Sequence, residues 1–79
     1  MQASDAKRLK TFGRSIRQFR KQHGMSQEDL AEASKLSRNY VSDIERGVRN
    51  PSLMAVVGIA RALRMPLRDL LADIEPRGR

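Results

Sequence analysis

The segment from Arg38 to Asp43 carries four polar side chains whose chemistry matches the edges of nucleic-acid bases. The guanidinium of Arg38 is a fork of N–H donors that fits guanine O6 and N7, and the carboxamide of Asn39 can pair with adenine N6 and N7. One helical turn further on, Ser42 can bond either base type and Asp43 can accept from cytosine N4. The segment is therefore a candidate for reading bases in a DNA groove. Ordinary solvated polar residues are the alternative interpretation.

Two helix-start signals, eleven residues apart, place this segment on the second of two short helices. Ser26 and Ser37 are hydroxyl N-caps, each preceded by an apolar residue and followed by another four positions later. Asp29 stands at the third helical position after Ser26, where its charge suits the positive end of the helix dipole. Two short helices joined by a tight turn over Ser26–Gly47 form a helix-turn-helix, whose second helix can enter the major groove of DNA.

Further polar residues around this motif are candidates for contacts with the phosphate backbone, which position a protein on DNA without reading its sequence. They lie in the expected first helix, along the second helix of the motif, and in the segment that follows it. These candidates are Arg17, Ser37, Tyr40, Arg46, Arg49 and Asn50. Arg49 has a second interpretation, insertion into a minor groove. For each of them an ordinary solvated surface residue is the alternative.

Positive charge dominates the chain but is unevenly distributed. The formal net charge is +7, which favours an anionic partner. Residues 1–25 hold seven Lys or Arg and one acid, whereas residues 26–50 hold four Lys or Arg and five acids. We therefore expect much of the phosphate attraction to come from the first helix, and base reading to come from the nearly neutral helix-turn-helix.

The composition excludes several other classes of function. The chain has no cysteine and a single histidine, His23, so neither a disulfide framework nor a metal site is expected. No apolar run approaches the roughly 20 residues that cross a bilayer, and no signal-like stretch follows the basic N-terminus. No nucleophile–base pair or paired-acid site can be assembled from these residues. We expect a soluble cytoplasmic protein, without enzyme activity and without a cofactor.

An amphipathic first helix is predicted by apolar residues at intervals of three and four. This stripe consists of Leu9, Phe12, Ile16 and Phe19. The helix should end at Gly24, which can adopt the left-handed conformation that follows many helices, with His23 near the negative end of the dipole. Residues 1–6 precede the stripe and are expected to form a flexible arm.

The remaining helices each show an inward-facing apolar set. In the helix-turn-helix these sets are Leu30 with Ala33 and then Val41 with Ile44. Ser52 caps a fourth helix, and its inward set is Leu53, Val56, Ile59, Ala60 and Leu63. A last short helix follows Pro66, with Leu67, Leu70, Leu71 and Ile74 on one side. The prediction is an all-α single domain over residues 1–79, with five helices, no strand and a flexible tail at 75–79.

The run from Gly13 to Leu71 closely resembles the Xre-like, lambda-repressor-like DNA-binding family of bacterial and phage regulators. The resemblance is carried by the segments GRSIRQFRKQHGMSQEDLAEAS, YVSDIERGVRNPS and IARAL. Within them the elements IR..R, GMSQ, LA, IERG, NPS and IA.AL stand at the family's spacings. The segment RNYVSDIERGVRN, in so short a chain, is especially similar to the controller proteins that time restriction-modification genes.

The resemblance implies a five-helix, lambda-repressor-like bundle that regulates transcription as a homodimer on a roughly palindromic operator. It places Gln27 on a DNA phosphate. It pairs Glu45, which lies on the partly buried side of the third helix, with Arg20 in a structural salt bridge. Many relatives carry glycine where this chain has Lys35, so we expect strain if the backbone there is left-handed.

A dimer interface is expected on the apolar side chains that the core leaves over. These are Met54, Val57, Leu67, Leu71 and Ile74. Little sequence remains to build an effector pocket, so no small-molecule effector is expected, and RNA polymerase is a further candidate partner. Two other function classes stay open: an antitoxin-type module that also binds a protein partner, and a basic helix that binds membrane surfaces. The membrane interpretation is weaker because the apolar stripe of the first helix is needed in the core.

Overall fold

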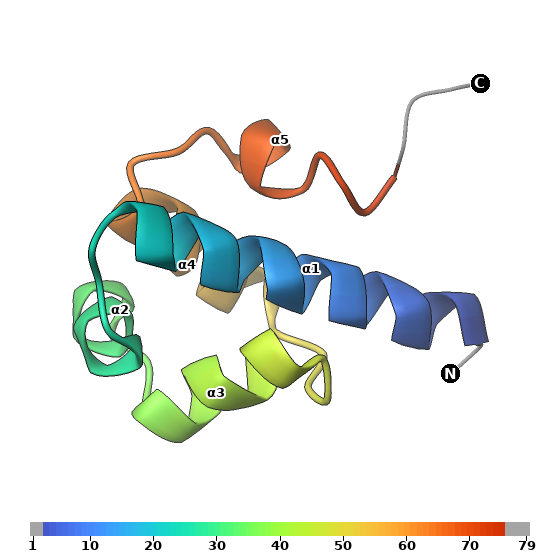
Figure 1. The fold of residues 1–79 in the computed structure, drawn as a ribbon, viewed down its shortest axis with the longest axis horizontal. Coiled ribbons are helices and arrows are strands. Elements are labelled where there is room, and N and C mark those ends of the chain that lie inside the picture. Colours follow the sequence, from blue (N-terminus) through green and yellow to red (C-terminus); the bar gives the residue numbers. More distant parts are fainter. Residues whose placement is uncertain (1–2, 76–79) are drawn as a thin grey trace.

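The computed structural model describes residues 3–75, which form an all-α structure. Its helices are α1 (Ala3–Gln22), α2 (Gln27–Ser34), α3 (Arg38–Arg46), α4 (Leu53–Ala62) and α5 (Leu67–Leu70). No strand occurs within the described residues. In Figure 1, α1 runs through the middle of the molecule, with α3 along one side of it and α5 on the other. The predicted fold class, five helices including a helix-turn-helix, is confirmed.

The first helix starts earlier than the apolar pattern indicated. It begins at Ala3, so the prediction of a flexible arm is wrong for residues 3–6, and residues 1–2 lie outside the described part. Asp5 in the first turn suits the helix dipole, and Arg8 Nη1 lies 3.5 Å from its carboxylate. This polar turn is exposed on all sides, which explains why no apolar stripe revealed it. Of the predicted tail, only Glu75 is described.

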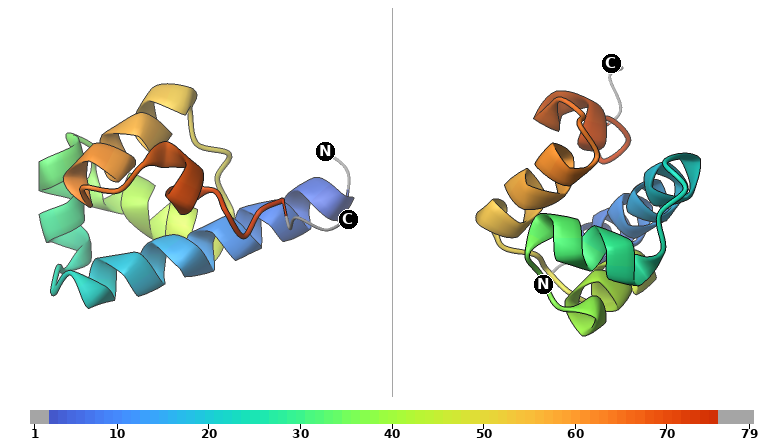
Figure 2. Two further views of the ribbon diagram at one scale, coloured as in Figure 1. Left: turned by 90° about the horizontal axis from the view of Figure 1, so that it is seen from above. Right: turned by 90° about the vertical axis from the view of Figure 1, so that its left-hand side faces the viewer.

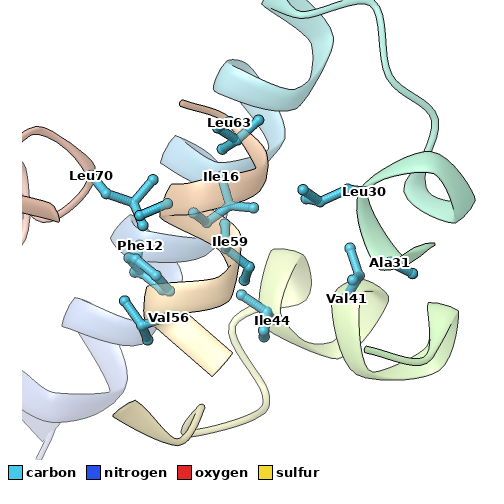
Figure 3. Packing of buried hydrophobic residues seen from close by; sticks show 11 residues of the cluster. Phe12, Ile16, Leu30, Ala31, Val41, Ile44, Val56, Ile59, Leu63 and Leu70 are labelled. Carbon is cyan, nitrogen blue, oxygen red and sulfur yellow. The ribbon is translucent and has the colours of Figure 1, made fainter. Parts of the chain in front are cut away.

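The hydrophobic core gathers side chains from all five helices around Ile16 (Figure 3). Its fully buried members are Ile16, Leu30, Val41, Ile44, Ile59, Leu63 and Leu70. Two predicted members are wrong, because Ala33 and Leu53 are both exposed. In α2 the buried face runs through Leu30, Ala31 and Ser34. The hydroxyl of Ser34 donates to Leu30 O at 2.6 Å. This polar side chain is therefore buried without leaving its hydroxyl unpaired.

Leu53 is exposed because it stands at the first position of α4, directly after the N-cap, where no other helix covers it. The buried face of α4 begins one turn later, with Ala55 and Val56. Val57 is partly buried and Met54 is exposed. The start of α4 therefore presents two large apolar side chains to solvent.

The three serine N-caps hold the helix starts as predicted. Ser26, Ser37 and Ser52 each accept a hydrogen bond from the backbone amide three residues later. At α2 the bond is reciprocal, since the Ser26 amide donates to Asp29 Oδ2 at 2.9 Å. This bond, assisted by the Ser26 hydroxyl, holds the pKa of the Asp29 carboxyl below its ordinary value. The entries into both helices of the motif are thereby fixed.

Left-handed residues end the first three helices. Gly24 has φ +67° and Gly47 has φ +75°. Lys35, in the turn between α2 and α3, has φ 61° and ψ 38°. This is the left-handed conformation considered for Lys35 because many relatives carry glycine at that position. Arg64 after α4 has φ 55°, which was not predicted. The helix-turn-helix of this chain thus makes its turn on a lysine in a strained backbone region.

A close approach of backbones joins α1 to α3. A Cβ added to Gly13 would lie 2.6 Å from Glu45 O and also collide with Ile44 O. Only glycine fits there, because both obstacles are backbone atoms that cannot rotate away.

Among residues 3–75, no helix is long and apolar enough to cross a membrane.

Candidate nucleic-acid interface

The third helix turns one face into the core and leaves the other open. Val41 and Ile44 are buried, whereas Arg38 and Asn39 in the first turn are exposed. At about 100° per residue, Arg38, Asn39, Ser42 and Asp43 occupy one side of the helix, away from the buried pair. Ser42 and Asp43 are partly exposed. The four predicted base-reading residues therefore share a single accessible face, and their contacts with bases remain a prediction.

An ion-pair cluster lies at the C-terminal end of this face. Asp43 Oδ1 accepts from Arg46 Nη2 at 2.7 Å, and Asp43 Oδ2 lies 3.9 Å from Arg49 Nε. The guanidinium carbon of Arg49 stands 4.3 Å from the centroid of the Tyr40 ring, within the range of a cation–π contact. We call Tyr40, Asp43, Arg46 and Arg49 the Asp43 cluster. It joins one predicted base-reading residue to three predicted phosphate-binding residues.

Tyr40 also ties the loop after α3 to the start of α4. Its hydroxyl accepts from the Ser52 amide at 3.0 Å, while its own amide donates to Ser37 Oγ at 3.0 Å. The loop between Gly47 and Ser52 carries Arg49 and the exposed Asn50. Because both ends of this loop are held, the two candidate phosphate-binding residues on it are positioned beside α3.

The opposite side of α3 holds a buried ionic network, which contains the predicted pairing of Arg20 with Glu45. Arg20 Nε and Nη2 lie 2.6 and 3.1 Å from the two Glu45 oxygens, and Arg20 Nη1 donates to Met25 O at 2.8 Å. The side chains are only 10% and 4% exposed. The carboxylate thus has a bidentate partner in a place largely shielded from water.

Gln27, which the family resemblance places on a phosphate, belongs to the same network. Its Nε2 donates to Glu45 Oε1 at 3.1 Å, and the residue is partly buried at the start of α2. No sequence spacing indicated this bond, because it joins residues that only the tertiary fold brings together. By contrast, the separation of Asp43 from Arg46 by three helical positions could have predicted their ion pair. Arg17 is exposed on α1, and its phosphate contact remains a prediction, as does that of Gln27.

Two remaining polar features bear on other chemistry. His23 lies at the end of α1, and its Nδ1 is 2.8 Å from Phe19 O. Within residues 3–75, no group of three or more His, Cys, Asp or Glu is arranged to hold a metal ion. The arrangement of side chains on α3 can form hydrogen bonds and ion pairs with an anionic polymer.

Comparison with known proteins places this geometry in a family. Residues 16–70 match a family described as helix-turn-helix. The chain belongs to this family. The helix-turn-helix chain is 49% identical over 61 residues to control protein C.BamHI of Bacillus amyloliquefaciens, covering 76% of this chain and 75% of that protein. It is 40% identical over 65 residues to control protein C.MunI of a Mycoplasma species, covering 81% and 88%.

Solved structures agree with these relatives. The restriction-modification controller protein C.AhdI from Aeromonas hydrophila superimposes with a TM-score of 0.77 and 45% identity, over 78% of this chain and 94% of that one. The clp gene regulator ClgR from C. glutamicum superimposes with a TM-score of 0.78 and 31% identity, over 85% and 87%. The helix-turn-helix chain therefore shares both fold and sequence with proteins named as regulators.

Proposed function

We propose that this protein is a sequence-specific, DNA-binding transcriptional regulator that acts as a homodimer on a roughly palindromic operator. The observation that carries the proposal is the open face of α3, on which Arg38 and Asn39 are exposed beside partly exposed Ser42 and Asp43. Side chains at the start of the second helix of a helix-turn-helix are the ones that reach base edges. Their donors and acceptors match guanine, adenine and cytosine.

Phosphate binding is assigned to residues on both sides of that face. The proposed contacts are Arg17, Gln27, Ser37, Tyr40, Arg46, Arg49 and Asn50. The backbone amides at the start of α2 add to them, because a helix N-terminus favours an anion. The excess of positive charge in the first 25 residues supports a long-range attraction to DNA that does not depend on sequence.

Within the regulators, we assign this chain to the restriction-modification controllers. The support is its similarity to C.BamHI and C.MunI, both named as control proteins, and to the controller C.AhdI. The relatives described above are regulators by name, which favours this assignment over the antitoxin-type alternative. A controller of this class would act in the cytoplasm, without a small-molecule effector, and its occupancy of the operator would be set by protein concentration through dimerisation. Contact with RNA polymerase is a further proposal of the same class.

Dimerisation is assigned to the apolar surface around α4 and α5. Met54 is exposed, as is Leu53, which was expected in the core, and Val57, Leu67, Leu71 and Ile74 are partly exposed. Leu71 and Ile74 also line an open groove with Leu9, Phe12 and Val56. A two-fold dimer over this surface would hide apolar area that a small monomer otherwise leaves in water. Its two α3 helices would enter successive major grooves about 34 Å apart.

The test is selection of bound duplexes from a random DNA pool, followed by binding measurements over a salt series. A two-fold symmetric consensus is expected, together with a steep fall of affinity as salt increases. Arg38→Ala should relax one base position in each half-site and cost about 1–3 kcal/mol of binding free energy at the wild-type sequence. Arg61→Ala is the control, since it removes the same charge from an exposed position on α4 and should leave the consensus unchanged. Uniform weak binding to all DNA would reject the proposal.

Membrane binding by α1 is disfavoured by the structure. Phe12 and Ile16 are buried and Phe19 is partly buried in the core, so α1 has no free apolar stripe to insert among lipids. Sedimentation with anionic vesicles tests this directly. We expect the protein to remain in the supernatant at physiological salt.

A further inference from the structure

The Asp43 cluster points to a device that limits binding to DNA of the wrong sequence. We propose that Asp43 acts as an internal counter-anion for Arg46 and Arg49, so that both arginines are partly neutralised until the protein meets its operator. This inference rests on the proposed function, because it concerns how the same α3 face distinguishes DNA sequences. In this role Asp43 increases specificity because it weakens binding to DNA of the wrong sequence.

The geometry assigns one arginine to each carboxylate oxygen. Arg46 Nη2 lies 2.7 Å from Asp43 Oδ1, and Arg49 Nε lies 3.9 Å from Asp43 Oδ2. Carboxylates and phosphates present the same kind of anionic oxygen to a guanidinium. Asp43 therefore occupies, within the free protein, donors that a DNA phosphate would otherwise take.

All three side chains remain accessible to DNA. The side chains of Arg46 and Arg49 are 65% and 46% exposed, and that of Asp43 is 31% exposed. Ion pairs at such exposure are weak, so a phosphate can replace the carboxylate without a large barrier. Arg49 keeps its place during such an exchange because its guanidinium also lies over the Tyr40 ring.

The exchange has a cost on any DNA, because it leaves the carboxylate without its partners beside a negatively charged polymer. Binding to non-specific DNA depends almost wholly on contacts between cations and phosphates. Non-specific binding offers the Asp43 carboxylate no new hydrogen-bond donor in place of the two arginines. The expected effect of Asp43 on random sequence is therefore a weaker affinity and a smaller number of counterions released.

A cognate site can compensate for that cost. Asp43 lies on the same face of α3 as Arg38 and Asn39, and cytosine N4 offers a donor in the major groove. At a base pair that presents this donor, the carboxylate gains a partner when the arginines leave. Arg38 differs, since it has no ion pair among residues 3–75 and is free to contact a base directly. The discrimination thus comes from the coupling between Asp43 and the two arginines behind it.

The test compares Asp43→Asn with Asp69→Asn on a random-sequence duplex and on the selected operator. Both variants raise the net charge by one, and Asp69 is exposed on α5, which lies across the molecule from α3 (Figure 2). Fluorescence anisotropy over a salt series gives the affinity and its salt dependence. Relative to Asp69→Asn, we expect Asp43→Asn to bind random DNA about two- to threefold more tightly, with a salt slope steeper by about 1 to 2.

The ratio of operator affinity to random-DNA affinity should fall about tenfold or more in Asp43→Asn, since the cognate donor loses its carboxylate while non-specific binding strengthens. In a protein that already carries Arg46→Ala and Arg49→Ala, adding Asp43→Asn should give no gain on random DNA, because those arginines supply the gain. Circular dichroism at each step confirms that the variants are folded. A gain that persists without the two arginines would overturn the proposal.

Other outcomes separate this inference from the proposed function. If Asp43→Asn matches Asp69→Asn on random DNA, the counter-anion role is wrong, even when the operator is bound normally. If Asp43→Asn only relaxes one base position, Asp43 is a plain base-reading residue and the inference is again rejected. If the wild-type protein does not distinguish the operator from random DNA, the proposed function fails, while the comparison on random DNA still reports on the counter-anion role.

Discussion

The inner and outer faces of α3 carry ion pairs of nearly equal length and opposite surroundings. Arg20 and Glu45 approach to 2.6 Å with side chains 10% and 4% exposed, whereas Arg46 and Asp43 approach to 2.7 Å with side chains 65% and 31% exposed. Distance alone would assign them the same role. Burial decides otherwise, because a buried charge needs its partner, while an exposed charge can exchange it for water, salt or a phosphate.

The further hydrogen bonds around each ion pair also differ between the buried and the exposed face of α3. Glu45 Oε1 accepts from both Arg20 and Gln27, and Arg20 also donates to Met25 O. No buried side-chain N or O atom in the described part lacks a hydrogen-bond partner. The inner network therefore joins α1, α2 and α3 into one unit, and the outer cluster stays available for a ligand.

Breaking the inner pair should have the largest effect on stability. Glu45→Ala leaves the Arg20 guanidinium buried beside a cavity, and we expect a loss of about 3–5 kcal/mol in the free energy of unfolding. Urea titration followed by circular dichroism measures it. In a double-mutant cycle with Arg20→Ala, the two losses should be strongly non-additive. Additive losses would mean that the two side chains do not stabilise each other.

Widening the contact between α1 and α3 should have the next largest effect. Gly13→Ala forces a Cβ against Glu45 O at 2.6 Å, so the helices must separate at a cost of about 1–3 kcal/mol. Gly58→Ala is the matched control, since its Cβ would lie 3.2 Å from Ser34 O. There the gain in helix propensity, about 1 kcal/mol, should offset most of the strain. Equal melting temperatures for the two variants would contradict the close approach.

Much of this fold was readable from local signals. Three serine caps, the apolar stripes and the left-handed residues after helices act over a few positions, so the sequence displays them directly. The start of α1 at Ala3 was missed because an exposed polar turn has no apolar periodicity. The prediction that Ala33 and Leu53 are buried rests on helical spacing, which identifies the side of a helix that faces the core. The width and length of the buried face depend on the neighbouring helices, which spacing does not describe.

The candidate site shows the same limit at longer range. The pairing of Arg20 with Glu45 was available only through resemblance to a family, because the two residues are distant in sequence. The pair between Asp43 and Arg46 follows from helical spacing. The place of Arg49 over Tyr40 depends on the path of a loop that no pattern in the sequence specifies. Local rules therefore located the outer face and its Asp43–Arg46 pair, and tertiary packing determined that Arg49 joins them.

The turn that leads into α3 offers a smaller test. Lys35 has φ 61°, a conformation that costs a side-chain-bearing residue about 1–2 kcal/mol. Glycine removes that strain but gains entropy in the unfolded chain, so Lys35→Gly should stabilise the fold by about 0.5–1 kcal/mol. Arg64→Gly, at φ 55° after α4, is the matched variant outside the helix-turn-helix and should behave alike. A lower melting temperature for Lys35→Gly would show that its turn is not left-handed in solution.

The outer pair should have the smallest effect on folding. Asp43→Asn keeps the shape of the side chain and removes an exposed ion pair, so the free energy of unfolding should change by less than about 0.5 kcal/mol. Urea titration of this variant beside Glu45→Ala measures the contrast between the two faces. A loss above about 2 kcal/mol would mean that the Asp43 cluster stabilises the fold as the inner network does. With folding unchanged, any difference in DNA binding by Asp43→Asn belongs to the outer face itself, because the inner network still holds α3 in place.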